Sequence, residues 1–152
     1  MEEGRIWAQI LTAVFLGICG TADFKSKRIR RPVPLIFAAG MLLFHPLLRD
    51  ADWISLFGGI LVGLGLLAAA RLTGEAIGYG DGLTVAACGA AVGFAQTFCV
   101  FALAVCLAAV WSAILLLFKK AGRKDAIPFV PFLFAAQICV MAGVLRQSGF
   151  GN

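Results

Sequence analysis

The chain carries its longest uncharged stretch at residues 83–118, which read LTVAACGAAVGFAQTFCVFALAVCLAAVWSAILLLF. One helix needs only about 17–25 apolar residues to cross the roughly 30 Å hydrocarbon core of a bilayer. This stretch is long enough for two crossings, and Gly93, Gln96 and Thr97 near its middle provide a place for a tight reversal. It therefore predicts two helices, at residues 83–95 and 97–118.

The remaining apolar runs are separated by short polar segments. The whole chain is 61% hydrophobic and 14% charged, whereas soluble domains are about 25% charged. Backbone polar groups must be satisfied inside lipid, so each apolar run is expected to be a helix. The sequence predicts an all-α membrane protein, a bundle of six transmembrane helices in one domain over residues 1–152. The other four helices are expected at residues 6–22, 33–48, 53–70 and 127–145.

Basic residues are distributed unevenly between the loops. Cytoplasmic loops of membrane proteins carry an excess of Lys and Arg. All but three of the 13 Lys and Arg residues fall in alternate loops: Lys25, Lys27, Arg28, Arg30, Arg31, Arg71, Lys119, Lys120, Arg123 and Lys124. The opposite side carries Arg5, Arg49 and Arg146. This distribution predicts an N-out/C-out topology with the basic loops in the cytoplasm.

Composition also argues against several classes of function. The net charge of +5 does not indicate nucleic-acid binding, because the charges form short clusters between apolar runs. The five cysteines lie inside apolar stretches and form no CxxC pair or Cys/His ligand set. Membrane lipid is therefore an expected partner, and neither a metal nor a cofactor is expected.

Two aspartates lie at the predicted cytoplasmic ends of helices. Asp23 ends the first helix, and Asp81 opens the fourth within the motif GYGDG at residues 78–82. The single histidine, His45, lies at the opposite side, so no Ser-His or Cys-His pairing is available. Two neighbouring carboxylates can instead share one proton, one acting as a base toward water and the other as an acid. The first and fourth helices of such a bundle can be neighbours, which makes Asp23 and Asp81 candidates for a catalytic pair.

Three motifs in order resemble the type IV prepilin peptidases, which are GxGD aspartyl proteases. They are DFKSKRI at residues 23–29, GYGD at residues 78–81 and IPFVPF at residues 127–132. The resemblance implies that Asp23 and Asp81 are catalytic. It also implies that Gly78, Gly80, Pro128 and Pro131 shape a groove for the substrate. The expected activity is removal of the leader peptide of prepilins or pseudopilins at the cytoplasmic face of the bacterial inner membrane.

The chain departs from the family pattern at three places. It reads Ile29-Arg30-Arg31-Pro32 where the family often has Ile-Pro-Asn, and Gly82-Leu83-Thr84 where a lysine is common. Val130 stands where a glycine is frequent. These differences leave the aspartates intact and leave the identity of the substrate open. The cytoplasmic segment with paired CxxC motifs found in larger members is absent from this sequence, so the chain resembles the short form, without methyltransferase activity or zinc.

Other functions remain open on the residues alone. A small transporter component using the same two aspartates to relay protons or bind a cation is the main alternative, and a non-catalytic subunit of a secretion machine is another. Gly59 and Gly63 in the third helix form a GxxxG pattern. This pattern serves either a homodimer or close packing within the bundle.

Overall fold

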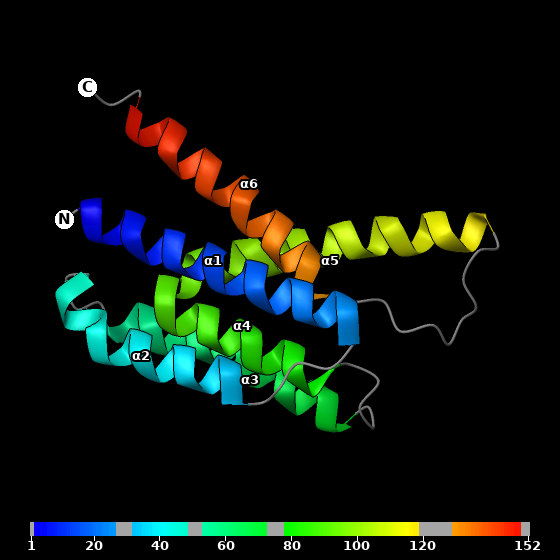
Figure 1. Cartoon of the computed structure of the whole chain (residues 1–152), viewed down its shortest axis with the longest axis horizontal. Helices are drawn as coiled ribbons and strands as arrows, with labels where there is room; N and C mark the ends of the chain where they lie inside the picture. The colour runs from blue at the N-terminus through cyan, green and yellow to red at the C-terminus, as the bar shows by residue number, and fades with distance from the viewer. Residues whose placement is uncertain (1, 27–31, 49–52, 73–77, 119–128, 150–152) are drawn as a thin grey trace.

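The computed structural model describes residues 2–26, 32–48, 53–72, 78–118 and 129–149. In these ranges every regular element is an α-helix, which confirms the prediction of an all-helical chain with six helices (Figure 1). The helices are α1 (Glu2–Ser26), α2 (Pro32–Leu48), α3 (Trp53–Leu72), α4 (Tyr79–Val92), α5 (Phe94–Leu117) and α6 (Val130–Gly149).

The reversal inside the long apolar stretch lies at Gly93, one of the positions that the sequence indicated. Gly93 has φ 83° and ψ 179°, a conformation that is essentially restricted to glycine. Its N–H donates to the carbonyl of Gly89 at 3.0 Å, and the hydroxyl of Ser55 accepts from the N–H of Phe94 at 3.1 Å. These bonds satisfy groups at the end of α4 and the start of α5 that a helix leaves open. The turn consists of one residue, as predicted, but it lies at residue 93 and not at residue 96, so α4 ends earlier and α5 begins earlier than predicted.

The start of α4 also differs from the prediction, which placed it at residue 83. The helix begins at Tyr79, so Gly80, Asp81 and Gly82 belong to its first turn and not to a loop. Glycine lowers helix propensity by about 1 kcal/mol, which is why the motif looked like a loop. Packing overrides that cost, because a Cβ on Gly82 would lie 2.9 Å from Cγ of Leu67 in α3.

Glycines hold α3 and α4 in close contact along their length. A Cβ on Gly59 would lie 2.7 Å from the carbonyl oxygen of Gly89, which is closer than real Cβ atoms come. One turn later, a Cβ on Gly63 would overlap the backbone of Ala86. The GxxxG pattern of α3 is therefore occupied by α4 within one chain. A homodimer stays a prediction, and this glycine face is not free to form it.

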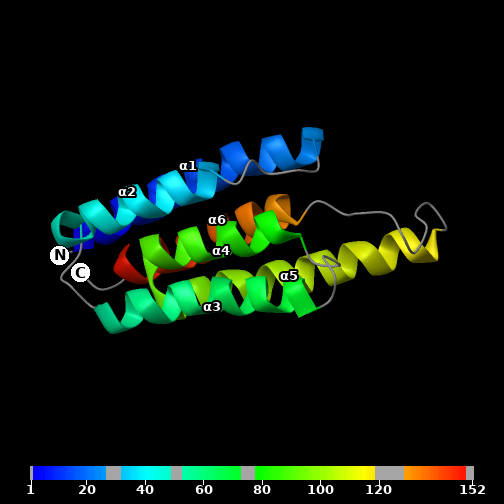
Figure 2. The ribbon, with the colours of Figure 1, turned by 90° about the horizontal axis from the view of Figure 1, so that it is seen from below.

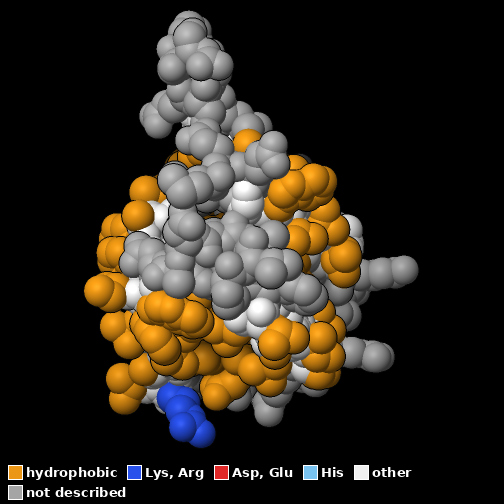
Figure 3. Space-filling model, turned by 90° about the vertical axis from the view of Figure 1, so that its left-hand side faces the viewer, with side chains coloured by type: hydrophobic (Ala, Val, Ile, Leu, Met, Phe, Trp, Pro, Cys, Tyr) orange, Lys and Arg blue, Asp and Glu red, His pale blue; other side chains and the backbone are white. Residues whose placement is uncertain are grey.

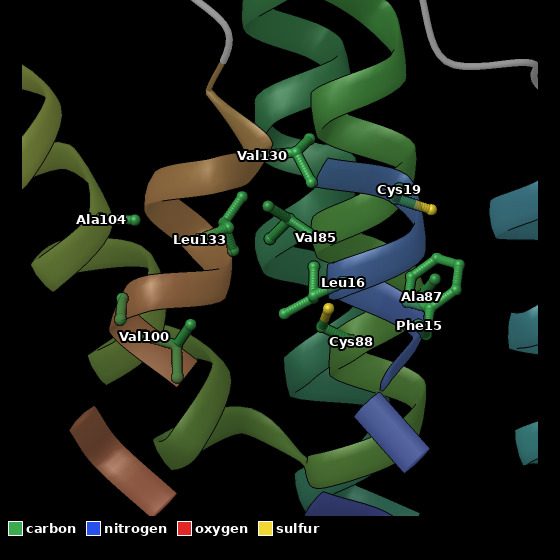
Figure 4. Packing of buried hydrophobic residues seen from close by; sticks show 11 residues of the cluster. Phe15, Leu16, Cys19, Val85, Ala87, Cys88, Val100, Ala104, Val130 and Leu133 are labelled. Atoms are coloured by element: carbon green, nitrogen blue, oxygen red, sulfur yellow. The ribbon is translucent and has the colours of Figure 1, made fainter. Parts of the chain in front are cut away.

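Helix α4 lies in the middle of the bundle, where it packs against α1, α2, α3 and α5, while α6 packs against α1 and α5. Leu16, Val85 and Leu133 point toward one another from α1, α4 and α6 (Figure 4). The buried cluster around them consists of Phe15, Leu16, Cys19, Val85, Ala87, Cys88, Val100, Ala104, Val130, Leu133 and Ala136. This core fixes the relative height of four helices.

The helices run up and down, so their ends gather in two groups (Figures 1 and 2). One group contains the last residues of α1 and α3 and the first residues of α2, α4 and α6; we call it the Asp81 end. The other group contains both terminal helix ends and the turn at Gly93. Hydrophobic side chains cover most of the described surface seen from this second end (Figure 3).

Two helices, α3 and α5, are long and apolar enough to cross a membrane. Shorter apolar helical stretches occur at Ile6–Thr21, Pro32–Leu43 and Val130–Val144. Six membrane crossings with both termini outside therefore stay a prediction.

Candidate active site

The motif GYGDG places Asp81 in the first turn of a helix. Gly78 precedes the helix in an extended conformation (φ −60°, ψ 123°). Its carbonyl accepts hydrogen bonds from the N–H of Asp81 at 3.0 Å and from the N–H of Gly82 at 3.4 Å. Asp81 is thus held at the beginning of α4 by its backbone.

The Asp81 side chain is half-buried and folds back over Gly78. Its Oδ2 lies 2.7 Å from the position that a Cβ of residue 78 would occupy, so only a glycine leaves this carboxylate where it is. The first turn of a helix is also the positive end of its dipole, which favours a negative charge by about 0.3–1 kcal/mol. Position and electrostatics both suit an ionised carboxylate at residue 81.

Thr84 fixes the same turn from within the bundle. Its hydroxyl donates to the carbonyl of Gly80 at 2.8 Å, and its side chain is completely buried. From the sequence, Thr84 was evident only as a departure from the family pattern, and its structural role was missed. The sequence signal for this role was the spacing of four residues between Gly80 and Thr84. On a helix, this spacing brings the hydroxyl of the later residue within hydrogen-bond reach of the carbonyl of the earlier one.

Asp23 reaches the same level from α1. It lies in the last turn of that helix; its side chain is outside the described part of the structure, so it is placed by its backbone. The two helices run antiparallel, with Ala8 and Ala91 in one buried cluster toward one end and Cys19 and Val85 in another toward the other. One further turn along each helix, about 6 Å, leads from Cys19 to Asp23 and from Val85 to Asp81.

Pro131 approaches the same region from α6. A Cβ on Gly20 would lie 3.7 Å from Cα of Pro131 and 3.9 Å from the carbonyl carbon of Val130, so α1 and α6 are in backbone contact there. Asp23 follows Gly20 by one turn. The ends of α1, α4 and α6 therefore meet at the Asp81 end. Pro128, the other predicted groove residue, lies outside the described residues.

The arrangement brings together most of the predicted site. Gly80 and Asp81 lie in the first turn of α4, Gly78 directly precedes this turn, and Pro131 lies in the first turn of α6. Within the described ranges, no group of three or more His, Cys, Asp or Glu side chains is placed to hold a metal ion. The groups that can take part in chemistry at these helix ends are the carboxylates of Asp23 and Asp81, at one edge of an apolar bundle.

Comparisons with known proteins agree with the motifs. The model of the type IV leader peptidase family matches residues 10–113, a range that includes both Asp23 and Asp81 and ends before α6. Searches of curated proteins and of solved structures found no match for the chain. The family match and the two long apolar helices together indicate a membrane protein. The chain belongs to the type IV leader peptidase family, a family of proteases.

Proposed function

We propose that this chain is an aspartyl endopeptidase in which Asp23 and Asp81 share one proton and cleave the leader peptide of prepilins or pseudopilins. The observation that carries the proposal is the antiparallel course of α1 and α4, because the last turn of α1, with Asp23, and the first turn of α4, with Asp81, lie at the same end of the bundle (Figure 1). Membership of the leader peptidase family supports the reaction class.

The two carboxylates divide the work of peptide hydrolysis. The ionised one removes a proton from a water molecule as that water attacks the scissile carbonyl carbon. The protonated one donates its proton to the carbonyl oxygen, which gives a tetrahedral diol. The carboxyl that took the proton from water then gives it to the leaving amine as the C–N bond breaks, and the other carboxylate takes a proton back from a hydroxyl of the diol. The pair thus ends the cycle with one proton between them. Positioned acid–base catalysis of this kind contributes about 10²–10⁴-fold to a rate.

The substrate would lie across the Asp81 end in an extended conformation. Gly78 and Gly80 carry no side chain that would keep a peptide away from Asp81, and Pro131 borders the site from α6. Pro128, in the segment before α6, completes the set that we propose as the substrate groove. The site needs no metal or cofactor for this chemistry.

We further propose that the chain is a multi-pass protein of the bacterial inner membrane with both termini outside and the Asp81 end toward the cytoplasm. The chain segments at residues 27–31 and 73–77 connect helix ends of the Asp81 group, and the segment at residues 119–128 connects the end of α5 to the first residue of α6 in that group. The first and last of these segments, with Lys25 and Arg71 at the adjoining helix ends, carry the excess of Lys and Arg that marks cytoplasmic loops. This placement supports cleavage at the cytoplasmic face.

The experiment is co-expression with candidate prepilins, followed by gel mobility and N-terminal sequencing of the pilin. The intact protein should shorten the pilin at a single bond, and Asp23→Asn and Asp81→Asn should each leave it unprocessed while remaining in the membrane. Asp125→Asn, in the segment before α6, and Asp52→Asn, in the segment before α3, are matched controls that should process normally.

Two outcomes would contradict the proposal. Normal processing by either Asp23→Asn or Asp81→Asn would show that the pair is not the catalyst. Failure to cleave any of several prepilins, together with an ion flux that needs both aspartates, would instead favour the transporter.

A further inference from the structure

Helix α5 is much longer than the helix beside it and leaves the bundle at the Asp81 end. It spans Phe94–Leu117, whereas α4, joined to it at Gly93, spans only Tyr79–Val92. Figures 1 and 2 both show α5 continuing past the ends of α1, α4 and α6. Thr97, Val100 and Ala104 are its only buried residues, and all of them lie in its first half.

The projecting half of α5 is apolar around its whole circumference. The exposed residues include Val110 at 59%, Leu117 at 81% and Phe118 at 70% exposed. Others at 40–50% exposure face different directions, since successive residues of a helix are about 100° apart: Val105, Trp111 and Ile114. A helix that is hydrophobic on all sides requires an apolar environment on all sides.

Helix geometry gives the height of this projection above the candidate site. Helix α4 ends and helix α5 begins at Gly93. At 1.5 Å per residue counted from this turn along each helix, the part of α5 level with Asp81 is roughly Val105. Val85 and Val100 lie in one buried cluster, which agrees with this register to within a residue. Phe118 then lies about 20 Å beyond the level of Asp81, measured along α5.

We propose that the hydrocarbon layer of the bilayer surrounds α5 up to the end of the helix. Measured along α5 from the turn at Gly93, the lipid surface would then lie farther out beside α5 than beside Asp81, and it would slope between these two places. The proposal rests on the membrane placement given under Proposed function. The occupant of the projecting half is lipid and not one docked helix, because a docked helix would cover one face and leave the others in water. Lys119 and Lys120 follow directly in the sequence and suit the headgroup layer at that height.

Such a slope would matter to the enzyme. The site would be open to water at the ends of α1, α4 and α6, whereas lipid acyl chains packed along α5 would border it on one side. A hydrophobic stretch longer than its neighbours distorts the bilayer locally, at a cost that depends on acyl-chain length. The thickness of the bilayer would then change how readily a substrate reaches Asp81.

Trp111 tests the proposal directly, because it lies about 9 Å beyond the level of Asp81 along α5. The variant with Trp7→Phe and Trp53→Phe keeps Trp111 as the only tryptophan. It is placed in dioleoylphosphatidylcholine vesicles that contain phosphatidylcholine brominated along its acyl chains, and fluorescence is compared with that in the presence of aqueous iodide. We expect brominated lipid to quench Trp111 more strongly than iodide does.

Two results would overturn the proposal. Stronger quenching by iodide would place the projecting half of α5 in water, with the bilayer surface near Asp81. Protection from both quenchers would mean that protein covers it. A second variant, Leu117→Trp on a tryptophan-free background, should respond to bromines near the headgroup, and a variant retaining only Trp7 reports the other end of the bundle. None of these readouts requires cleavage, so they stand or fall separately from the catalytic role of the aspartates.

Discussion

The Asp81 carboxylate lies over Gly78, with Oδ2 2.7 Å from the place where a Cβ of residue 78 would be. The conformation of Gly78 itself (φ −60°, ψ 123°) is one that any residue can adopt. A side chain at residue 78 would therefore displace the neighbouring carboxylate, whereas the backbone conformation does not itself need a glycine. This relationship links the glycines of the motif to the proposed chemistry.

Gly78→Ala should impair cleavage without unfolding the protein. The new methyl group forces the Asp81 carboxylate to rotate away, and a misplacement of about 1 Å can lower a rate by about 10²-fold. The measurement is kcat for a prepilin peptide beside the thermal midpoint in detergent. Gly65→Ala is the matched control, because nothing lies within 4 Å of a Cβ there. Full activity of Gly78→Ala would mean that the position of Oδ2 is unimportant.

Gly63→Ala should destabilise the bundle by about 1–3 kcal/mol, the usual cost of overpacking. Its methyl group would overlap the backbone of Ala86, which cannot move without separating α3 from α4. Unfolding in a denaturing detergent measures the change, again against Gly65→Ala on the exposed side of the same helix. Equal stability of the two variants would contradict the close contact of α3 and α4.

Gln137→Leu should raise the stability by about 1 kcal/mol, because an unpaired buried amide costs about 1–3 kcal/mol. Gln137 is completely buried in α6, and neither its Oε1 nor its Nε2 has a hydrogen-bond partner among the residues that the structure describes. Gln9→Leu is the contrasting variant, since the Gln9 amide donates to Oε1 of Gln96 at 3.3 Å and its loss leaves Gln96 unpaired. Destabilisation by Gln137→Leu would show that a polar partner binds its amide.

The sequence predicted the helices well where apolarity and glycine agreed. The reversal at Gly93 could be inferred because a long uncharged stretch must turn somewhere, and a glycine provides the positive φ. The start of α4 at Tyr79 could not, because local propensity opposes a helix through Gly80 and Gly82. Only the tertiary contact between Gly82 and Leu67 compensates for it.

The candidate site was predictable in its residues but not in its geometry. Charge distribution and motifs singled out Asp23 and Asp81, and the antiparallel packing of α1 and α4 gives both backbones one level. The contact between Gly20 and Pro131 had no local signal, because it depends on how α6 returns to α1. The length difference between α4 and α5 was already present in the predicted ranges 83–95 and 97–118, but the turn lies at residue 93 and not at the predicted residue 96.

Cleavage by the purified protein in lipid vesicles tests the pairing of Asp23 and Asp81 most directly. With a prepilin that the unmodified chain processes, Asp23→Asn and Asp81→Asn should each lower the rate by at least about 10²-fold, the usual contribution of a positioned acid or base. Asp52→Asn and Asp125→Asn should cleave at the unmodified rate. An undiminished rate in either Asp23→Asn or Asp81→Asn would contradict a shared proton between the two helix ends.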